Sequence, residues 1–584
     1  MTPRFGTHRN GDATTFRLWA PAAQRVEIVL DGAHPMQQAA EGWHELTLSG
    51  VRACALYKYR LENGTEVPDP ASHFQPHDVF GPSEVIDHDA FVWHAGRWRG
   101  RPWHEAVILE LHVGTFTPAG TFLSAIEKLD HVVETGFTAI ELMPVADFSG
   151  ARNWGYDGVL LYAPDSAYGR PDDLRALVDA AHARGLMVFL DVVYNHFGPE
   201  GNYLGRYAPE FFTRAQTPWG NAVDYRVPQV RAFIIDNALH WLDHYRFDGL
   251  RLDAVHAIVE PGHPSILDDL SRVAGHFAAA SGRHIHLILE NDDNRASLLD
   301  PNTDPPQGKY RAQWNDDYHH AWHVVLTGEH NGYYQDYAAD PLDRLARALS
   351  SGFAYQGESS AHRRRPRGEA SGRLSPLAFI GFLQNHDQIG NRPTGDRLAG
   401  EIEDDAMTAA LAVTLLSPMP PLLFMGEEWG SRRPFPFFCD FKGALADAVR
   451  KGRSEEFKRL SNGTVQEMPD PLRSETFRSA VLDWEACATD EGRRRLALVR
   501  NLLTTRASLT HELAQVKFGS AHREKSVLIV SWSLPGGKTL DLIANLSHEA
   551  AAFPRACSRG RPLWGGAASE QLRPWAVHWS IGDG

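Results

Sequence analysis

The N-terminal part of the chain alternates β-forming and polar positions in short runs. These runs lie between Gly, Pro, Asn and Asp residues, which favour turns. The alternation predicts a small β-sandwich over residues 1–93, closed by a loop rich in Pro, His and Asp at Pro68 to Pro82. The runs are TTFRLWAP (14–21), RVEIVL (25–30), WHELTL (43–48) and LYKYRLE (56–62).

From about Ala106 the pattern changes to buried apolar runs that alternate with helical periodicity. Strands alternating with helices predict a parallel sheet, and about eight repeats predict a (β/α)8 TIM barrel over residues 94–510. Seven strand runs are clear, and a sixth-position strand near Gln313 is inferred from the count. The clear runs are AVILELHV (106–113), FTAIELM (137–143), LMVFLDVVYNH (186–196), DGLRLDAV (248–255), IHLILEN (285–291), LAFIGFLQNHD (377–387) and PLLFMGEE (421–428); the helical runs include 122–136, 171–185 and 231–245.

The β pattern returns after a helical run at 490–509. VKFG, VLIVSWS, LDLIANLS and VHWSIG predict a second, C-terminal β-sandwich over residues 511–584. The predicted architecture is therefore a barrel flanked by a β-sandwich on each side.

The amino-acid composition argues against some classes of function. A chain of 584 residues with a formal net charge of −15 is an acidic protein of several domains. An acidic surface repels phosphate backbones and anionic lipid, so we expect neither nucleic acid nor membrane as a partner. Arg363, Arg364, Arg365 and Arg367 are read as a solvated loop.

Cysteine usage and the N-terminus bear on location. Cys54, Cys439, Cys487 and Cys557 lie far apart, without metal-ligand spacing. The N-terminal residues lack the apolar core of a signal peptide. Both observations favour a reduced, cytoplasmic protein.

Polar residues close four of the strand runs. Because the carboxyl ends of barrel strands form one rim, these residues are expected to converge there. Arg251 and Asp253 are two positions apart on a strand, so their side chains point to the same side, and the cation would keep the carboxylate ionised. The strand-end groups are Asp191 to His196, Arg251 to Asp253, Glu290 to Asp292, and Asn385 to Asp387.

Carboxylates from separate strands on one rim suit glycoside cleavage. One ionised carboxylate attacks the anomeric carbon, and one protonated carboxyl gives its proton to the leaving oxygen. Retaining enzymes hold the two groups about 5–5.5 Å apart, which neighbouring strands allow. A third acid can hold sugar hydroxyls.

Four of these segments, DVVYNH, GLRLDAVHA, LILEND and FLQNHD, resemble in order the signature segments of the α-amylase family, as do MPVADF (143–148) and NWGYDG (153–158). The resemblance implies that Asp253 is the nucleophile, Glu290 the acid/base and Asp387 the transition-state stabiliser. It implies a sugar subsite lined by Arg251, His196, His386 and Asp191, with Tyr156 stacked beneath the ring. Further residues expected to bind substrate are Trp219, His256, Asn315 and Asp316.

Further segments resemble the members of this family that release trehalose. They are Gln313 to Tyr337, Phe353 to Glu358 and Leu422 to Gly430. This resemblance implies cleavage of the α-1,4 bond between a maltooligosyl chain and a terminal trehalose, that is, a maltooligosyltrehalose substrate. It also implies a metabolic partner, the synthase that makes the substrate. The sequence shows no oxygen-ligand loop of the kind that binds calcium, so we expect neither a catalytic metal nor a cofactor.

Several alternatives stay open. A branching enzyme, a debranching enzyme or a general amylase would share the catalytic trio, and the loops after strands three and six would decide among them. A non-catalytic glucan-binding protein is a rival of another class. Asp253 with Arg251 could be a structural ion pair, and His319, His320 and His323 could suggest a metal site. Glu427 and Glu428 are a rival pair, but neighbours on a strand point opposite ways.

Overall fold

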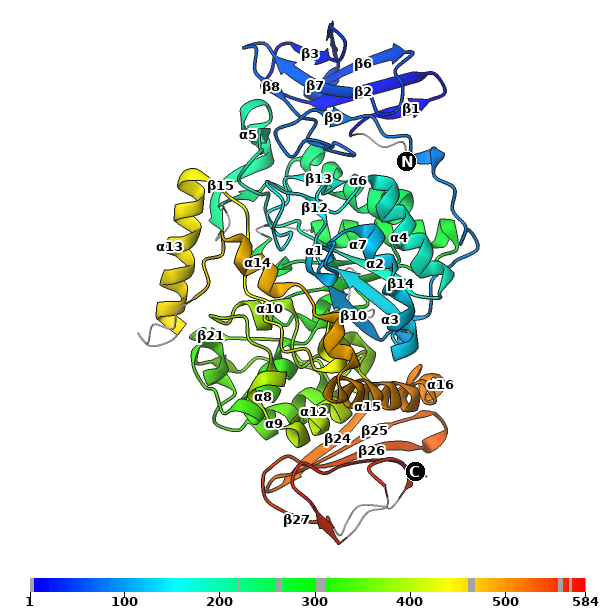
Figure 1. The fold of residues 1–584 in the computed structure, drawn as a ribbon, viewed down its shortest axis with the longest axis vertical. Coiled ribbons are helices and arrows are strands. Elements are labelled where there is room, and N and C mark those ends of the chain that lie inside the picture. The colour runs from blue at the N-terminus through cyan, green and yellow to red at the C-terminus, as the bar shows by residue number, and fades with distance from the viewer. Residues whose placement is uncertain are drawn as a thin grey trace.

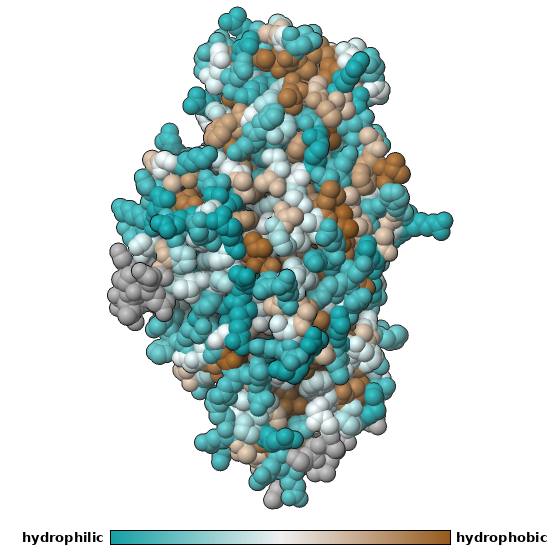
Figure 2. All heavy atoms as spheres, viewed as in Figure 1, coloured by the Kyte–Doolittle hydropathy of each residue, from teal (hydrophilic) through white to brown (hydrophobic). Residues whose placement is uncertain are grey.

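The computed structural model describes residues 5–217, 220–258, 260, 265–300, 310–460, 468–554, 560–566 and 570–582. Figure 1 shows three parts along the long axis, with the N-terminal strands at one end, the barrel in the middle and the C-terminal sheets at the other end. The visible face is predominantly hydrophilic, with hydrophobic residues in small separate groups (Figure 2).

The N-terminal part is a β-sandwich, as the alternation predicts. One sheet has the order β1-β2-β6-β5, and the other has the order β4-β3-β7-β8, with β9 also paired to β7. Phe16, Ile28 and Tyr59 are buried between them, because alternate residues of each strand face inward. The strands are β1 (His8–Asn10), β2 (Ala13–Trp19), β3 (Val26–Val29), β4 (Ala33–Pro35), β5 (Gln37–Gln38), β6 (Trp43–Ser49), β7 (Leu56–Leu61), β8 (Glu66–Val67) and β9 (Ser83–Glu84).

The eight-stranded parallel barrel is confirmed. Its order is β22-β19-β18-β17-β14-β11-β10-β23, and a parallel bridge between Gly381 and Pro421 joins the two end strands. The inferred sixth strand is present as β19 (Ala312–Trp314), which includes Gln313. The other strands are β10 (Ile108–Leu111), β11 (Ala139–Leu142), β14 (Met187–Val192), β17 (Gly249–Leu252), β18 (His286–Leu289), β22 (Phe379–Ile380) and β23 (Leu422–Phe424).

Amphipathic helices cover the barrel. The helical run at 122–136 forms two helices, α2 (Phe122–Ile126) and α3 (Leu129–Thr135), and α3 ends at Gly136 in the left-handed region. Apolar faces of the longer helices pack on the strands, which are buried on both sides. These helices include α4 (Pro171–Ala183), α6 (Pro228–His244), α7 (Ile266–Ser281), α8 (Asp316–Thr327), α9 (Pro341–Ser351), α12 (Asp404–Leu416) and α15 (Asp490–Ala507).

The C-terminal part contains antiparallel sheets that dock on barrel helices. The larger sheet has the order β24-β25-β26-β30-β28, and β27 pairs with β29. The Trp532 indole donates to the Leu349 carbonyl on α9 at 2.8 Å, and the Trp579 indole donates to the Ala412 carbonyl on α12 at 3.1 Å. The strands are β24 (Lys517–Glu524), β25 (Val527–Ser533), β26 (Thr539–Asn545), β27 (Ala551–Ala552), β28 (Arg561–Trp564), β29 (Gln571–Leu572) and β30 (Val577–Gly582).

A histidine cluster lies where the N-terminal part meets α6. The ring nitrogens of His73, His88 and His240 lie within 4.8 Å of one another. Hydrogen bonds already use them: His88 Nε2 lies 3.0 Å from His73 Nδ1, His240 Nε2 lies 2.9 Å from the Tyr162 carbonyl, and Arg175 donates to His88. The cluster is therefore a hydrogen-bonded contact between the two parts of the molecule.

We expect this cluster to make the fold sensitive to acid. Burial lowers the pKa of His73, His88 and His240 well below its usual value, so these rings stay neutral when folded. The unfolded chain takes up protons as pH falls through about 6.5, so the free energy of unfolding decreases below that pH. Urea unfolding at pH 7.5 and 5.0 measures the decrease. His88→Gln combined with His240→Gln should reduce it, and an unchanged decrease would contradict this explanation.

Candidate active site

A cavity of about 700 Å³ opens at the carboxyl ends of the barrel strands. Asp253 directly follows β17 and Glu290 directly follows β18, and both line it. Their side chains are 12% and 15% exposed, whereas that of Asp387 is 36% exposed. The lining includes Trp154, Tyr156, His196, Asp253, Ala254, His256, Glu290, Asp292, Asp316, His320, Tyr333, Asp336, Tyr337, His362, Arg363, Arg367, His386, Asp387, Gln388, Asn391, Phe437 and Arg453.

Arg251 joins three carboxylates beneath this cavity. Its Nη1 lies 2.8 Å from both oxygens of Asp191 and 2.8 Å from Asp253 Oδ1, and its Nη2 lies 2.8 Å from Glu290 Oε2. The guanidinium is fully buried and lies 4.1 Å from the centre of the Trp314 ring. Burial alone would lower the pKa of Arg251, but the carboxylates around it raise this pKa above its usual value. One planar cation therefore orients both proposed catalytic acids.

Backbone geometry completes the anchoring of these acids. The amides of Asp253 and Glu290 continue the strand pairing, donating to the carbonyls of Val192 and Leu252 at 3.0 Å. Ala254 adopts a φ of 42°, and its amide donates to Glu290 Oε2 at 2.9 Å. This left-handed conformation is uncommon outside glycine, so the turn after β17 holds a strained residue beside the acids.

The third acid, Asp387, lies beside a charged histidine. His386 Nδ1 binds Glu110 on β10, and His386 Nε2 lies 3.7 Å from Asp387 Oδ1. Burial alone would lower the pKa of His386, but Glu110 and Asp387 raise it to about 9. Burial also raises the pKa of Asp387, against the opposing effect of His386. His386 is therefore a cationic donor at neutral pH.

We expect Glu110→Gln to move the alkaline limb of the pH profile. Loss of the carboxylate lowers the pKa of His386, so His386 loses its proton at a lower pH. The alkaline limb of kcat/KM should then shift down by about one pH unit or more. Glu141→Gln is the matched control, since Glu141 pairs with Glu110 across the strands and burial raises its pKa well above the usual range. Equal shifts in both variants would contradict the assignment.

Tyr156 and His196 form one side of the cavity. The Tyr156 hydroxyl donates to Asp191 Oδ2 at 2.6 Å, and His196 Nε2 lies 2.9 Å from the Tyr156 carbonyl. The Tyr156 ring stacks on His386, with centroids 5.1 Å apart. Burial raises the pKa of Asp191 to about 7, although Arg251 opposes this. These contacts fix the Tyr156 ring in one orientation at the cavity.

The sequence-predicted residues divide into four groups. Those that line the cavity with the catalytic trio are Tyr156, His196, His256, Asp316 and His386. Asp191 and Arg251 are buried against residues of the lining. Asn315 is fully buried, and its amide donates to the Gly352 carbonyl at 2.9 Å, so the structure does not bring it to the lining. Trp219 lies outside the described residues.

Two readings of clustered residues need correction. The arginines at 363–367 are expected in a solvated loop. Arg364 and Arg365 are exposed as expected, but Arg367 is buried and both Arg363 and Arg367 line the cavity. They are held there by ion pairs with Asp292, Asp293 and Asp317. Pairing with acids distant in sequence offsets part of the desolvation cost of burying these cations.

Glu427 and Glu428, the rival pair of acids, also lie in a different kind of element from the predicted strand. They were assigned to a strand, but β23 ends at Phe424 and both lie in a 3-10 helix, Glu427–Trp429. Glu428 pairs with His131, and Glu427 accepts from the Phe424 amide at 3.2 Å. Both acids have structural partners.

The histidines of α8 are buried. Of His319, His320 and His323, only His320 is in the cavity lining, and the structure does not group them as metal ligands in the part of the chain that it describes.

Sequence reasoning missed Glu110, and for Trp314 it left open a sugar platform or a core residue. Glu110 lies in the first strand run and Trp314 in the weak sixth strand. Glu110 lies inside its run, with Leu111 after it, so a criterion based on the polar residues that end strands does not find it. Trp314 is buried against the Arg251 guanidinium, which agrees with the core alternative.

The arrangement can perform acid/base-assisted displacement at a sugar carbon. It has a carboxylate fixed by Arg251, a second carboxyl that follows the next strand, and a third acid in the same cavity lining. Aromatic and hydroxyl-binding groups surround them, as sugar sites require.

Two family descriptions match the chain. Residues 112–216 match "Alpha amylase, catalytic domain", and residues 4–74 match "Carbohydrate-binding module 48 (Isoamylase N-terminal domain)". The first match covers the early barrel, and the second covers most of the N-terminal sandwich.

Relatives match most of the chain. A malto-oligosyltrehalose trehalohydrolase of Deinococcus radiodurans is 43% identical over 85% of this chain and 81% of its own length. The protein of that name from Saccharolobus solfataricus is 41% identical over 82% of this chain and 84% of its own. The crystal structure of a protein from Salmonella typhimurium that is named as an alpha amylase also resembles this chain. The two share 43% sequence identity, the match covers 100% of both chains, and the TM-score is 0.94.

Among the described residues, none of the helices combines the length and apolar character needed to cross a bilayer.

Proposed function

The chain belongs to the malto-oligosyltrehalose trehalohydrolases of the α-amylase family, and from that premise we propose that Asp253, Glu290 and Asp387 carry its catalysis. It is a glycoside hydrolase that releases trehalose from the end of a maltooligosaccharide. The observation that carries the proposal is that the buried guanidinium of Arg251 binds the carboxyl groups of both Asp253 and Glu290. Retaining hydrolysis needs a nucleophile and an acid that lie close together.

In the first step a carboxylate oxygen of Asp253 attacks the anomeric carbon of the maltooligosyl unit. The bond from that carbon to the oxygen of trehalose breaks, and Glu290 gives its proton to this oxygen. Arg251 and the Asn195 amide, which lies 3.2 Å from Asp253 Oδ2, fix the attacking group. Asp387 and charged His386 hold ring hydroxyls of the distorted sugar.

In the second step Glu290 takes a proton from water. The water oxygen attacks the anomeric carbon, and the ester to Asp253 breaks. Two inversions return the α configuration, so the freed maltooligosaccharide starts as its α anomer. Glu290 ends the cycle protonated and Asp253 ends it ionised.

A product assay tests the reaction. Trehalose-capped maltopentaose, plain maltopentaose and a branched glucan are incubated separately, and the products are identified. We expect free trehalose from the first substrate as the main product. A new α-1,6 linkage would instead indicate a branching enzyme, and tight binding without turnover would indicate a glucan-binding protein.

Partner and location follow from the same proposal. The substrate carries a trehalose cap, so a synthase that converts the end of a maltooligosaccharide must supply it. Cys54, Cys439 and Cys487 are free thiols, which suits a reducing compartment, and we place the chain in the cytoplasm on that ground.

A further inference from the structure

Trp314 is a buried tryptophan that contacts both the apolar interior of the barrel and the cation of the site. It ends β19, is 1% exposed and belongs to an apolar cluster formed by several barrel strands. The rings of Phe382 and His386 contact it, with centroids 5.8 and 5.9 Å away. The guanidinium carbon of Arg251 lies over its ring, 4.1 Å from the centre. This distance is well within the range of about 6 Å over which a ring face attracts a cation.

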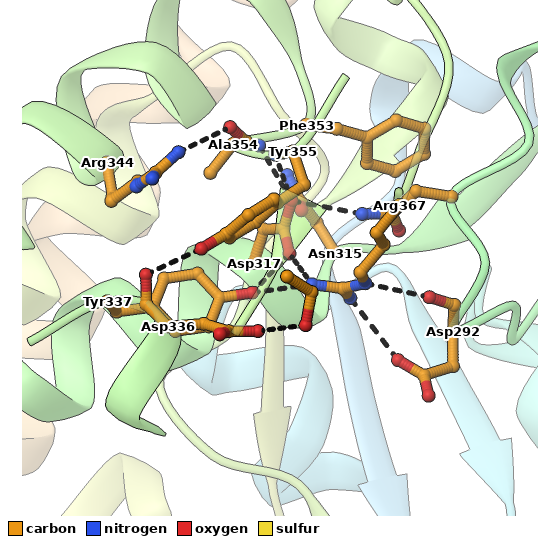
Figure 3. A network of polar contacts seen from close by, with 12 residues as sticks. Asp292, Asn315, Asp317, Asp336, Tyr337, Arg344, Phe353, Ala354, Tyr355 and Arg367 are labelled. Carbon is orange, nitrogen blue, oxygen red and sulfur yellow. Dashed lines mark hydrogen bonds and ion pairs between the residues drawn. The ribbon is translucent and has the colours of Figure 1, made fainter. Parts of the chain in front are cut away.

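The chain that follows β19 is anchored, which limits movement of the indole. The Asn315 side chain donates to the Gly352 carbonyl at 2.9 Å. Asp317, fully buried on the first turn of α8, accepts from the Ala354 amide at 2.7 Å (Figure 3). Both contacts tie the end of the strand to the segment at 352–354. The ring therefore has a fixed place under the site.

The hydrogen bonds of Arg251 leave one direction of movement weakly restrained. Both of its Nη atoms bind carboxylates, whereas its Nε is buried and has no hydrogen-bond partner among the described residues. The N–H bonds of a guanidinium lie in its plane, so these hydrogen bonds resist movement within the plane more than movement out of it. A ring face over the guanidinium carbon supplies the missing restraint.

The indole contributes through its ring and not through its N–H group. Its Nε1 is buried and lacks a hydrogen-bond partner in the part of the chain that the structure describes. A buried donor without a partner is costly, and a smaller apolar residue would avoid that cost. Of the aromatic side chains, however, tryptophan has the face that attracts cations most strongly.

We propose that the electron-rich face of Trp314 positions Arg251 and, through it, Asp253 and Glu290. This inference rests on the proposed function, which gives those two acids their roles. Trp314 lies outside the described lining of the cavity, so it acts on the chemical step and not on substrate binding. A shift of about 1 Å in reacting groups can cost about 10²-fold in rate, so a cation that binds both acids must be held closely.

The sharpest test weakens the ring face with little change in its size. Mono-, di- and trifluorotryptophan are incorporated at position 314 alone, because each fluorine withdraws electron density from the face and weakens its attraction for a cation. On trehalose-capped maltotetraose, kcat should fall with each fluorine, by about 10-fold over the series. KM should stay within about 2-fold of the wild-type value, since the ring does not contact the substrate.

Two substitutions of similar size complement this series. Trp314→Leu removes the face, and kcat per folded molecule should fall about 10²-fold. Trp314→Phe keeps a weaker face and should recover most of that loss, with KM changed less than about 3-fold in both variants. Trp322→Leu is the matched control, because Trp322 is a fully buried tryptophan of α8 whose ring contacts Tyr318. It should destabilise the fold and leave kcat per folded molecule unchanged.

The outcomes separate the two proposals. A kcat that does not depend on the number of fluorines, or equal losses in Trp314→Leu and Trp314→Phe, overturns the positioning role, while wild-type release of trehalose leaves the proposed function intact. Activity retained in both Asp253→Asn and Glu290→Gln overturns the proposed function, and the inference with it. If Trp314→Leu does not fold, the fluorinated proteins still decide, because their packing is preserved.

Discussion

Asp253→Asn should reduce turnover of trehalose-capped maltooligosaccharide by several orders of magnitude, because an amide cannot form the glycosyl ester. Glu290→Gln should cost about 10²–10⁴-fold, the range of general acid–base assistance. Steady-state kcat on purified variants measures both. Substantial activity in either variant would refute its role.

The activities of the same two variants should respond differently to a change of leaving group. Glu290→Gln should still transfer the glycosyl unit from 4-nitrophenyl α-maltotetraoside, because nitrophenolate leaves without a proton, and a burst should precede slow turnover. Asp253→Asn should show no burst. Asp248→Asn is the matched control: Asp248 is a buried acid just before β17, where it binds His182 and the Val188 amide at 2.9 Å. It should affect stability and leave turnover per folded molecule unchanged.

Arg251→Met should both destabilise the fold and abolish activity. It removes the cation that three carboxylates share, and leaving buried charges without a partner costs about 3–5 kcal/mol. Released from Arg251, Asp253 and Glu290 also lose their orientation, so we expect turnover to fall by at least about 10²-fold. Urea unfolding and kcat on the folded fraction measure the two effects.

Arg506→Met separates activity from stability. Arg506 is also buried, but its guanidinium donates to carbonyls, among them Leu415 at 3.2 Å and Met419 at 3.0 Å. Its loss should destabilise the fold and leave turnover per folded molecule unchanged. A similar loss of turnover in both variants would show that Arg251 acts only through stability.

The sequence predicted the barrel and much of its rim for a simple reason. Buried strands read as apolar runs, and the polar residue that ends a run must lie at the rim. Asp253, Glu290 and Asp387 lie in one cavity on this basis, and the even spacing of Arg251 and Asp253 correctly placed both on one side of the strand. The longer strands of the N-terminal sandwich, such as β2, β6 and β7, were predictable from alternation, whereas short strands such as β5 and β8 were not.

The sequence could not predict which way individual side chains point, or which ion pairs form between residues distant in the chain. Asn315 and Asp316 are neighbours at the start of α8, yet Asp316 lines the cavity while Asn315 turns to the Gly352 carbonyl. One residue of helix rotates a side chain by about 100°, and only the packed structure fixes which residue faces the substrate. Likewise, a run of arginines gives no sign of the buried Asp317 that draws Arg367 inward.

The most direct measurement is the capture of the covalent intermediate. Glu290→Gln is mixed with α-maltotriosyl fluoride, whose fluoride leaves without protonation, and the reaction is quenched, digested and analysed by mass spectrometry. The account predicts one maltotriosyl group on the peptide that contains Asp253, as an ester on that residue. An ester on another residue, or fluoride release with β-maltotriose and no ester, would contradict it.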